Sequence, residues 1–145
     1  MGDVRISQGR YTEAESLLIQ ALEMRKHLLG EEHIAIATSF HNLATLYGYQ
    51  QRYNEAEVVC KQALDIRKSF LGEENLNVAD SISNLGNIYG CQQRYIEAEN
   101  LHQQALNMYH RLLGNEHPCT ALSINNLASI YFFEERYGEA IIPIL

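Results

Sequence analysis

The chain has 145 residues, of which 46% are hydrophobic and 20% are charged, and it contains only two prolines. This composition excludes a disordered polar tail, a collagen-like chain and a disulfide-stapled miniprotein, and the length suits one domain or one repeat array. Eighteen acidic residues against 11 Lys and Arg give a formal net charge of −7. Because an acidic chain gains no counterion release on a phosphate backbone, we expect no nucleic-acid partner.

The three cysteines, Cys60, Cys91 and Cys119, lie far apart and form no CxxC pair. A zinc ribbon or a thioredoxin-type site is therefore not expected. Free thiols are typical of a reducing compartment, and we expect the cytoplasm. No apolar run approaches the roughly 18 residues of a membrane helix, and the N-terminus has no signal-peptide pattern, so we expect no membrane partner.

The sequence repeats itself every 42 residues. The string RYxEAE occurs at 10–15, 52–57 and 94–99, and it weakens to RYGEAI at 136–141. Aligning residues 10–51 with 52–93 gives 22 identities in 42 positions. Such a period is the signature of a repeat architecture. We therefore predict a single array over 1–145.

Each repeat is predicted to contain two helices, called here first-type and second-type. In chain order, the expected elements are a truncated first-type helix at 1–9, repeat units at 10–51, 52–93 and 94–135, and a truncated second-type helix at 136–145. Within the units, first-type helices are expected near 34–50, 76–92 and 118–134. Each second-type helix precedes its first-type helix and ends before a glycine (Gly30, Gly72 or Gly114), a residue that tolerates a left-handed C-terminal position.

Apolar stripes at helical spacing support these assignments. On the first-type helices the stripe repeats three times, as Phe40, Leu43, Ala44 and Tyr47, then Ile82, Leu85, Gly86 and Tyr89, then Ile124, Leu127, Ala128 and Tyr131. On the second-type helices it comprises Ala14, Leu17, Ala21, Leu22, Leu28 and Leu29, with copies 42 and 84 residues later. These spacings place each set on one helix face. Each hairpin leaves an apolar face open, so consecutive hairpins are expected to stack into an all-α solenoid.

These patterns resemble the tetratricopeptide repeat. The resemblance rests on Leu43 and Ala44 followed by Tyr47, then on Ala56 and Ala63 in the next helix. The 42-residue period, with LGEEH or LGNEHP between helices and NLA or NLG in the first-type helix, is similar to kinesin light chain repeats. The resemblance implies a right-handed superhelical solenoid of antiparallel helix hairpins. It also implies a concave groove, lined by first-type helices, that binds a peptide of a protein partner.

No catalytic signature is present, because GxxxxGK[ST], HExxH, GxSxG and GxGxxG are all missing. The acidic pairs that begin with Glu13 and Glu15 fall in the first turn of each second-type helix, where carboxylates favour the helix dipole. Cys60 and His102 occupy equivalent core positions in successive repeats and could approach each other, but we favour the structural explanation of a buried thiol beside a partly buried imidazole. We expect no enzyme activity, no cofactor and no metal.

Positions carried over from the family define a predicted groove on the first-type helices. These are Thr38, His41, Asn42, Thr45 and Tyr49 in the first helix, Asp80, Ser83, Asn84, Asn87 and Cys91 in the second, and Leu122, Asn125, Asn126, Ser129 and Phe133 in the third. Asn42, Asn84 and Asn126 repeat at one position. An asparagine amide can pair with a peptide N–H and C=O together. Alternatively, these asparagines tie adjacent helices together or are inherited by repeat duplication.

The positions of the basic residues restrict the chemistry of the expected partner. None of the 11 Lys and Arg residues lies in 34–50, 76–93 or 118–135. Kinesin light chains recognise acidic peptides, which requires basic groups in the groove, so we expect instead a neutral or mildly basic peptide, anchored near Tyr49, Phe132 or Phe133. The alternative function is an architectural array that self-associates through its exposed ends as an end-to-end homo-oligomer. In that case changes at Ile141, Ile142 and Ile144 would alter the oligomeric mass.

Overall fold

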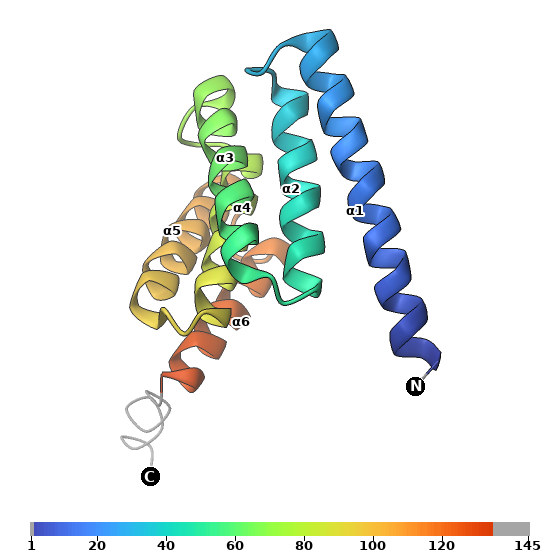
Figure 1. Ribbon diagram of the computed structural model, residues 1–145. Helices are drawn as coiled ribbons and strands as arrows, with labels where there is room; N and C mark the ends of the chain where they lie inside the picture. The colour runs from blue at the N-terminus through green and yellow to red at the C-terminus, as the bar shows by residue number, and fades with distance from the viewer. Residues whose placement is uncertain (1, 135–145) are drawn as a thin grey trace. The chain divides into compact units, whose positions relative to one another are not determined.

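The computed structural model describes the backbone of residues 2–134 and the side chains of residues 8–134 (Figure 1). Over this range the chain forms six α-helices and no strand. In chain order they are α1 (Gly2–Leu29), α2 (Ile34–Tyr49), α3 (Tyr53–Leu71), α4 (Leu76–Cys91), α5 (Tyr95–Leu113) and α6 (Pro118–Phe133). The three predicted first-type helices are therefore found within one residue of their expected ends, as α2, α4 and α6.

The helices group into two compact units, residues 1–70 and 71–145. In the first unit α1 packs against α2. In the second unit α5 packs against both α4 and α6. These two units do not test the predicted division into three 42-residue repeat units, which stays a prediction.

The predicted apolar stripes are buried in two of the three first-type helices. Phe40, Leu43, Ala44 and Tyr47 are buried on α2, and Ile82, Leu85, Gly86 and Tyr89 are buried on α4. The third copy differs, because Ile124 is 52% exposed and Ala128 is also exposed. The helix expected to cover this face begins at 136, outside the described residues. The apolar stripe of α6 is thus partly exposed, whereas its copies on α2 and α4 are buried.

The alanines of the predicted stripes on α3 and α5 are buried. Ala56, Ala63, Ala98 and Ala105 are fully buried, which lets neighbouring helices approach closely. Several of the larger predicted core residues are instead exposed, namely Leu17, Leu28, Leu29, Phe70 and Leu112. Leu17, Leu28 and Leu29 belong to α1, which packs against α2, and their exposure shows that they lie on parts of α1 that this contact leaves uncovered.

Residues 1–9 do not form the end of a separate helix. Instead α1 runs unbroken from Gly2 to Leu29. The turns at the equivalent positions 51 and 93 are held by a stacked pair, with the Arg52 guanidinium 4.3 Å from the Tyr47 ring centre and Arg94 3.8 Å from the Tyr89 ring centre. At the first copy the tyrosine position is Arg5. Arginine has no aromatic ring, so the stacked pair that holds the two later turns has no counterpart at this copy.

The conserved spacing of RYxE is explained by the start of each second-type helix. Arg52 Nη2 lies 2.5 Å from Glu55 Oε2, and Arg94 Nη2 lies 2.6 Å from Glu97 Oε2. Arg52 also reaches Glu15 of α1 at 2.8 Å. The pKa of the Glu55 carboxyl is lowered by its hydrogen bond to Arg52. Glu55 and Glu97 therefore form ion pairs with the arginine that precedes their helix. Their place in the first turn is also favourable for the helix dipole.

The histidines of the LGEEH and LGNEHP loops are helix caps. His33 Nδ1 accepts a hydrogen bond from the Ala35 N–H, and His117 Nδ1 accepts one from the Cys119 N–H, each at 3.1 Å. At the equivalent position Asn75 Oδ1 accepts from the Asn77 N–H at 2.8 Å. The caps satisfy backbone donors that the first helical turn leaves open. These histidines therefore have a structural explanation that needs no ligand.

Replacing His117 by alanine should lower the free energy of unfolding by about 0.5–1 kcal/mol, because the Cys119 N–H loses its acceptor. His117→Asn should leave it unchanged, since asparagine already caps α4 at the same place. Urea denaturation of both variants measures the difference. Equal losses in the two variants would show that the side-chain acceptor does not stabilise α6.

Candidate functional site

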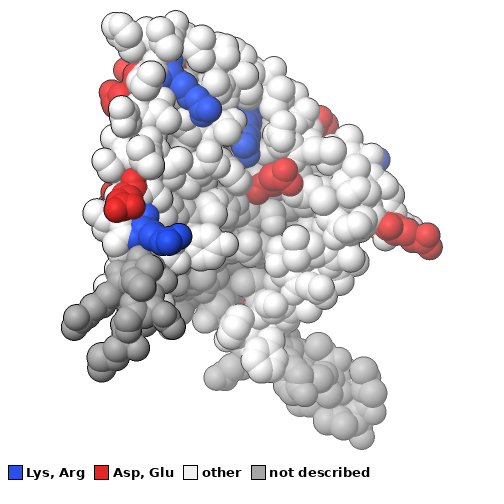
Figure 2. Space-filling view, turned by 90° about the vertical axis from the view of Figure 1, so that its right-hand side faces the viewer, with Lys and Arg blue, Asp and Glu red and all other residues white. Residues whose placement is uncertain are grey.

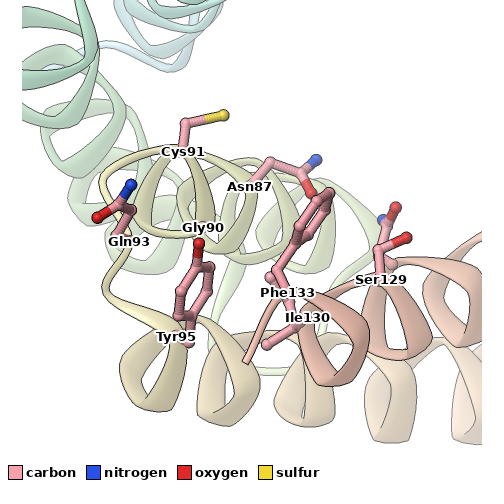
Figure 3. A pocket seen from close by; sticks show the side chains of 9 residues that line it. Asn87, Gly90, Cys91, Gln93, Tyr95, Ser129, Ile130 and Phe133 are labelled. Atoms are coloured by element: carbon pink, nitrogen blue, oxygen red, sulfur yellow. The ribbon is translucent and has the colours of Figure 1, made fainter. Parts of the chain in front are cut away.

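The second unit contains a cavity beside α4 and α6. It has a volume of about 460 Å³ and is lined by Asn87, Gly90, Cys91, Gln93, Tyr95, Asn126, Ser129, Ile130 and Phe133. Figure 3 shows α4 supplying Asn87, Gly90 and Cys91, while Ser129, Ile130 and Phe133 come from α6. Five of these residues belong to the predicted groove, namely Asn87, Cys91, Asn126, Ser129 and Phe133.

The lining combines polar groups with an apolar floor. In Figure 3 the Phe133 ring extends from α6 toward the Asn87 amide of α4. Ile130 is buried, whereas Asn87, Ser129 and Phe133 are exposed. None of the nine lining residues is Asp, Glu, Lys, Arg or His. The cavity therefore offers amide and hydroxyl groups beside an aromatic ring, a combination typical of sites that orient a ligand with few polar contacts.

Gly90 determines how closely α6 approaches α4. A methyl group at Gly90 would lie only 2.9 Å from Ile130 Cδ1, which is closer than carbon atoms pack. Glycine inside a helix costs about 1 kcal/mol relative to alanine. The same position is Gly48 in α2 and Phe132 in α6. Gly90 thus permits the close contact that forms the floor of the cavity.

The three asparagines predicted to form a ladder do not share one environment. Asn42 is exposed on α2 in the first unit, whereas Asn84 and Asn126 are half-buried in the second. Asn126 Nδ2 donates to Ser83 Oγ of α4 across 3.4 Å, a long hydrogen bond. The Asn84 amide nitrogen is buried and has no hydrogen-bond partner among the described residues. Asn126 therefore connects adjacent helices, as the alternative interpretation of these asparagines supposed.

Asp80, the single acidic residue of the predicted groove, is engaged by α5. The Tyr109 hydroxyl donates a hydrogen bond to Asp80 Oδ1. Burial, and then this bond to Asp80, raise the pKa of the Tyr109 hydroxyl. Asp80 thus accepts a hydrogen bond within the second unit, and its carboxylate is less available to a ligand.

The remaining predicted groove residues lie outside the cavity. Leu122 and Asn125 are exposed on α6, and the Ser129 hydroxyl donates to the Asn125 carbonyl. In the first unit α2 exposes Thr38, Asn42, Thr45 and Tyr49, with His41 half-buried. There the Thr45 hydroxyl donates to the His41 carbonyl at 3.1 Å. Each of these residues therefore lies on a first-type helix, and members of the α4 and α6 sets line the cavity described above.

Four lining residues were missed by the sequence analysis: Gly90, Gln93, Tyr95 and Ile130. Gln93 has a positive φ of 64° and lies in the turn after α4. Tyr95 begins α5 and Ile130 belongs to the buried side of α6. One signal was available, because a glycine recurs inside the first-type helices at 48 and 90. A recurring glycine inside a helix usually has a packing reason; of these two, Gly90 has Ile130 as a close neighbour, whereas nothing lies within 4 Å of a methyl group at Gly48.

Charge on the first-type helices matches the sequence prediction. No Lys or Arg lies on α2, α4 or α6, and Asp80 is their one carboxylate. On the face shown in Figure 2, the described Lys, Arg, Asp and Glu side chains lie scattered among uncharged atoms and do not gather into one patch. A helix surface without Lys or Arg offers no electrostatic attraction to a strongly acidic ligand, and its single carboxylate offers little to a strongly basic one.

His102 is the main buried ionisable group of the second unit. It is 0% exposed and both ring nitrogens lack a hydrogen-bond partner among the described residues. Burial lowers the pKa of the imidazole to about 4. Cys60, at the equivalent position in the first unit, is also buried, and burial raises the pKa of its thiol to about 12. The approach of Cys60 to His102 stays a prediction. The described residues contain no cluster of three potential metal ligands.

The tetratricopeptide repeat family matches residues 1–69, 37–109 and 77–143, and the chain belongs to this family. Repeats of this family typically mediate protein–protein interaction, and the family is generally non-enzymatic. No curated protein is similar enough to this chain to count as a match. None of the described helices has the length and apolar character needed to cross a membrane.

Solved structures identify the kind of repeat. A crystal structure of BtubC (BKLC) from P. vanneervenii has a TM-score of 0.78 and 29% identity, over 91% of this chain and 52% of that one. A putative kinesin light chain of Podosopora anserina, with nearly identical TPR-like repeats, has a TM-score of 0.82 and 27% identity, over 93% of this chain and 64% of that one. The predicted all-α solenoid with kinesin light chain-like repeats is thereby confirmed. The chain spans about half of the first structure and under two thirds of the second.

Proposed function

We propose that the chain is a non-enzymatic protein–protein interaction scaffold that binds a peptide segment of a partner on its first-type helices. The cavity beside α4 and α6 carries this proposal, because it is the place where predicted groove residues surround a hollow of about 460 Å³. A preformed concave site of this size accommodates a side chain together with a stretch of backbone. The exposed residues of α2, from Thr38 to Tyr49, have the same role in the first unit.

The chemistry of the lining selects a neutral or mildly basic peptide with an apolar anchor. Asn87 and Asn126 offer amide donors and acceptors to the peptide backbone. Phe133 and Ile130 form an apolar surface for an aliphatic or aromatic side chain, and such anchors contribute much of the affinity of interfaces. A strongly acidic peptide finds no Lys or Arg here. Its desolvated carboxylates would be left unpaired, which opposes binding.

We further propose that this interaction takes place in the cytoplasm. The three cysteines Cys60, Cys91 and Cys119 are all free thiols, and free thiols persist in a reducing compartment. We also propose that the chain binds neither nucleic acid nor a membrane, since its first-type helices present no basic surface.

A peptide-display selection tests the proposed function. The native chain should enrich peptides that share an apolar anchor and lack a cluster of acidic residues. The double variant Asn87→Ala with Asn126→Ala should lose these peptides, because the amides that bind the backbone are removed. Asn100→Ala, at an exposed asparagine of α5, is the matched control and should keep them.

Circular dichroism of all three proteins establishes that they are equally helical before the selections are compared. Enrichment of the same peptides by the native chain and the double variant would contradict binding at this cavity. Enrichment of acidic peptides would contradict the proposed partner chemistry. The variants would still show whether such peptides bind at this cavity.

A further inference from the structure

The cavity beside α4 and α6 presents two aromatic rings to a ligand. Tyr95 begins α5 and Phe133 ends α6, and both residues line the hollow of about 460 Å³. In Figure 3 the two rings extend toward α4, on which Gly90 carries no side chain. Phe133 is exposed and Tyr95 is half-buried. The face of an aromatic ring carries partial negative charge and attracts a cation that lies within about 6 Å of the ring centre.

Two polar groups of the lining already use their donors inside the second unit. The Ser129 hydroxyl donates its one proton to the Asn125 carbonyl at 3.0 Å, so its oxygen can only accept a hydrogen bond from a ligand. Asn126 Nδ2 uses one of its two N–H groups on Ser83 Oγ, whereas the carbonyl oxygen of that amide retains its capacity to accept. These two groups therefore favour a ligand that donates hydrogen bonds.

The charge around the cavity also favours a cation. None of the nine lining residues is charged, and α4 and α6 carry no Lys or Arg. The chain has a formal net charge of −7, and a net charge of this sign raises the local concentration of cationic ligands. Because Asn87, Ser129 and Phe133 are exposed, a charged group bound here keeps part of its hydration. It thereby avoids the large cost of burying a charge completely.

The chain itself contains the ring contact that such a ligand would make. The Arg52 guanidinium lies 4.3 Å from the Tyr47 ring centre. Arg94 and Tyr89 form the same contact at 3.8 Å. A guanidinium is planar, weakly hydrated and rich in N–H donors, so it can stack on a ring and donate to neighbouring oxygens at the same time. The aliphatic stem of an arginine would pack on Ile130, the buried apolar residue of the lining.

We propose that an arginine side chain of the partner peptide occupies this cavity. Its guanidinium group lies against the Phe133 and Tyr95 rings, and its N–H groups donate to Ser129 Oγ. Its aliphatic stem is the apolar anchor on Ile130, and its charge makes the peptide mildly basic. This inference rests on the proposed function, because it names the residue that the peptide-binding cavity selects.

The test begins with the peptides that the native chain enriches in the display selection. We expect these peptides to share an arginine. A synthetic peptide with citrulline at that place should bind about tenfold more weakly, because citrulline keeps the shape of arginine and loses the charge that the rings attract. Isothermal titration calorimetry of the full chain measures both affinities. Equal affinities, or enriched peptides without a shared arginine, would overturn the proposal.

Variants of the chain show whether the aromatic rings are responsible. Phe133→Leu keeps an apolar side chain but has no ring, so the preference for the arginine peptide over the citrulline peptide should fall about threefold. Tyr95→Phe keeps its ring and should retain the preference. Phe70→Leu, at an exposed phenylalanine of α3, is the matched control and should also retain it. An unchanged preference in Phe133→Leu would assign the attraction to the general negative charge of the chain, which overturns the proposal.

Failure of this inference differs from failure of the proposed function. If the double variant Asn87→Ala with Asn126→Ala loses the peptides, the cavity binds peptides, and the citrulline and Phe133→Leu results decide whether arginine occupies it. If no peptide is enriched, or if the double variant keeps the peptides, binding at the cavity is itself wrong and so is the arginine site. Circular dichroism establishes that every variant is as helical as the native chain.

Discussion

Gly86→Ala is expected to lower the free energy of unfolding by about 1–2 kcal/mol. Alanine in place of a helical glycine gains about 0.5–1 kcal/mol, but overpacking a buried contact costs about 1–3 kcal/mol. The new methyl group would lie within 2.9–3.1 Å of three atoms of the His102 ring. Because this ring is fully buried, it cannot move aside into solvent. Urea denaturation followed by circular dichroism measures the loss.

A second substitution should restore stability. The equivalent positions in the first unit are Ala44 and Cys60, both buried, so alanine is there combined with a side chain smaller than histidine. His102→Cys alone should destabilise the chain, because it leaves a cavity beside Gly86. The double variant Gly86→Ala with His102→Cys should be more stable than the sum of the two single changes predicts. Additive losses would show that the two positions do not compensate each other in size.

The stability of the second unit is expected to fall as the pH decreases from about 6.5 to 4. Burial lowers the pKa of His102 from 6.5 to about 4 in the folded chain. Between these values the unfolded chain binds more protons than the folded one, so its population rises as pH falls. A shift of this size corresponds to about 3 kcal/mol. The full contribution is present above pH 6.5 and is lost as the pH approaches the pKa of the folded state.

Urea denaturation at a series of pH values measures this dependence. The His102→Cys variant is the control, because the thiol stays neutral throughout the range and this contribution to the slope should vanish. All other histidines are unchanged in that variant, so the comparison isolates the contribution of His102. Identical pH profiles of the native chain and the variant would contradict the burial of a neutral imidazole at this position.

The fold could be predicted because its repeat has a strict period. Apolar residues at Phe40, Leu43, Ala44 and Tyr47 recur 42 residues later, and helical spacing places each set on one face. The helix ends were predictable from local chemistry, since a left-handed glycine such as Gly30 terminates the second-type helix. By contrast, the uninterrupted α1 was not predicted, because residues 1–9 were aligned with the ends of the first-type helices although they match residues 43–51 only at Gln8.

The candidate site could be predicted only in part. Helical spacing places Asn87 and Ser129 on the exposed sides of their helices, which is information contained in the sequence. The floor of the cavity depends on how closely α6 approaches α4 at Gly90 and Ile130, and this distance is set by packing between residues 40 positions apart. The engagement of Asp80 by Tyr109 and of Asn126 by Ser83 likewise required the tertiary structure. Periodicity alone does not determine such contacts.

The most direct test of peptide binding uses the native cysteines as reporters. Cys91 is an exposed thiol in the lining of the cavity, Cys119 is a half-buried thiol outside that lining, and Cys60 is buried. The measurement is the rate of alkylation of each cysteine, followed by mass spectrometry, with and without a saturating amount of a selected peptide. We predict that the peptide slows the alkylation of Cys91 and leaves that of Cys119 unchanged. An unchanged rate at Cys91 with the peptide bound would contradict the assignment of the cavity beside α4 and α6 as the binding site.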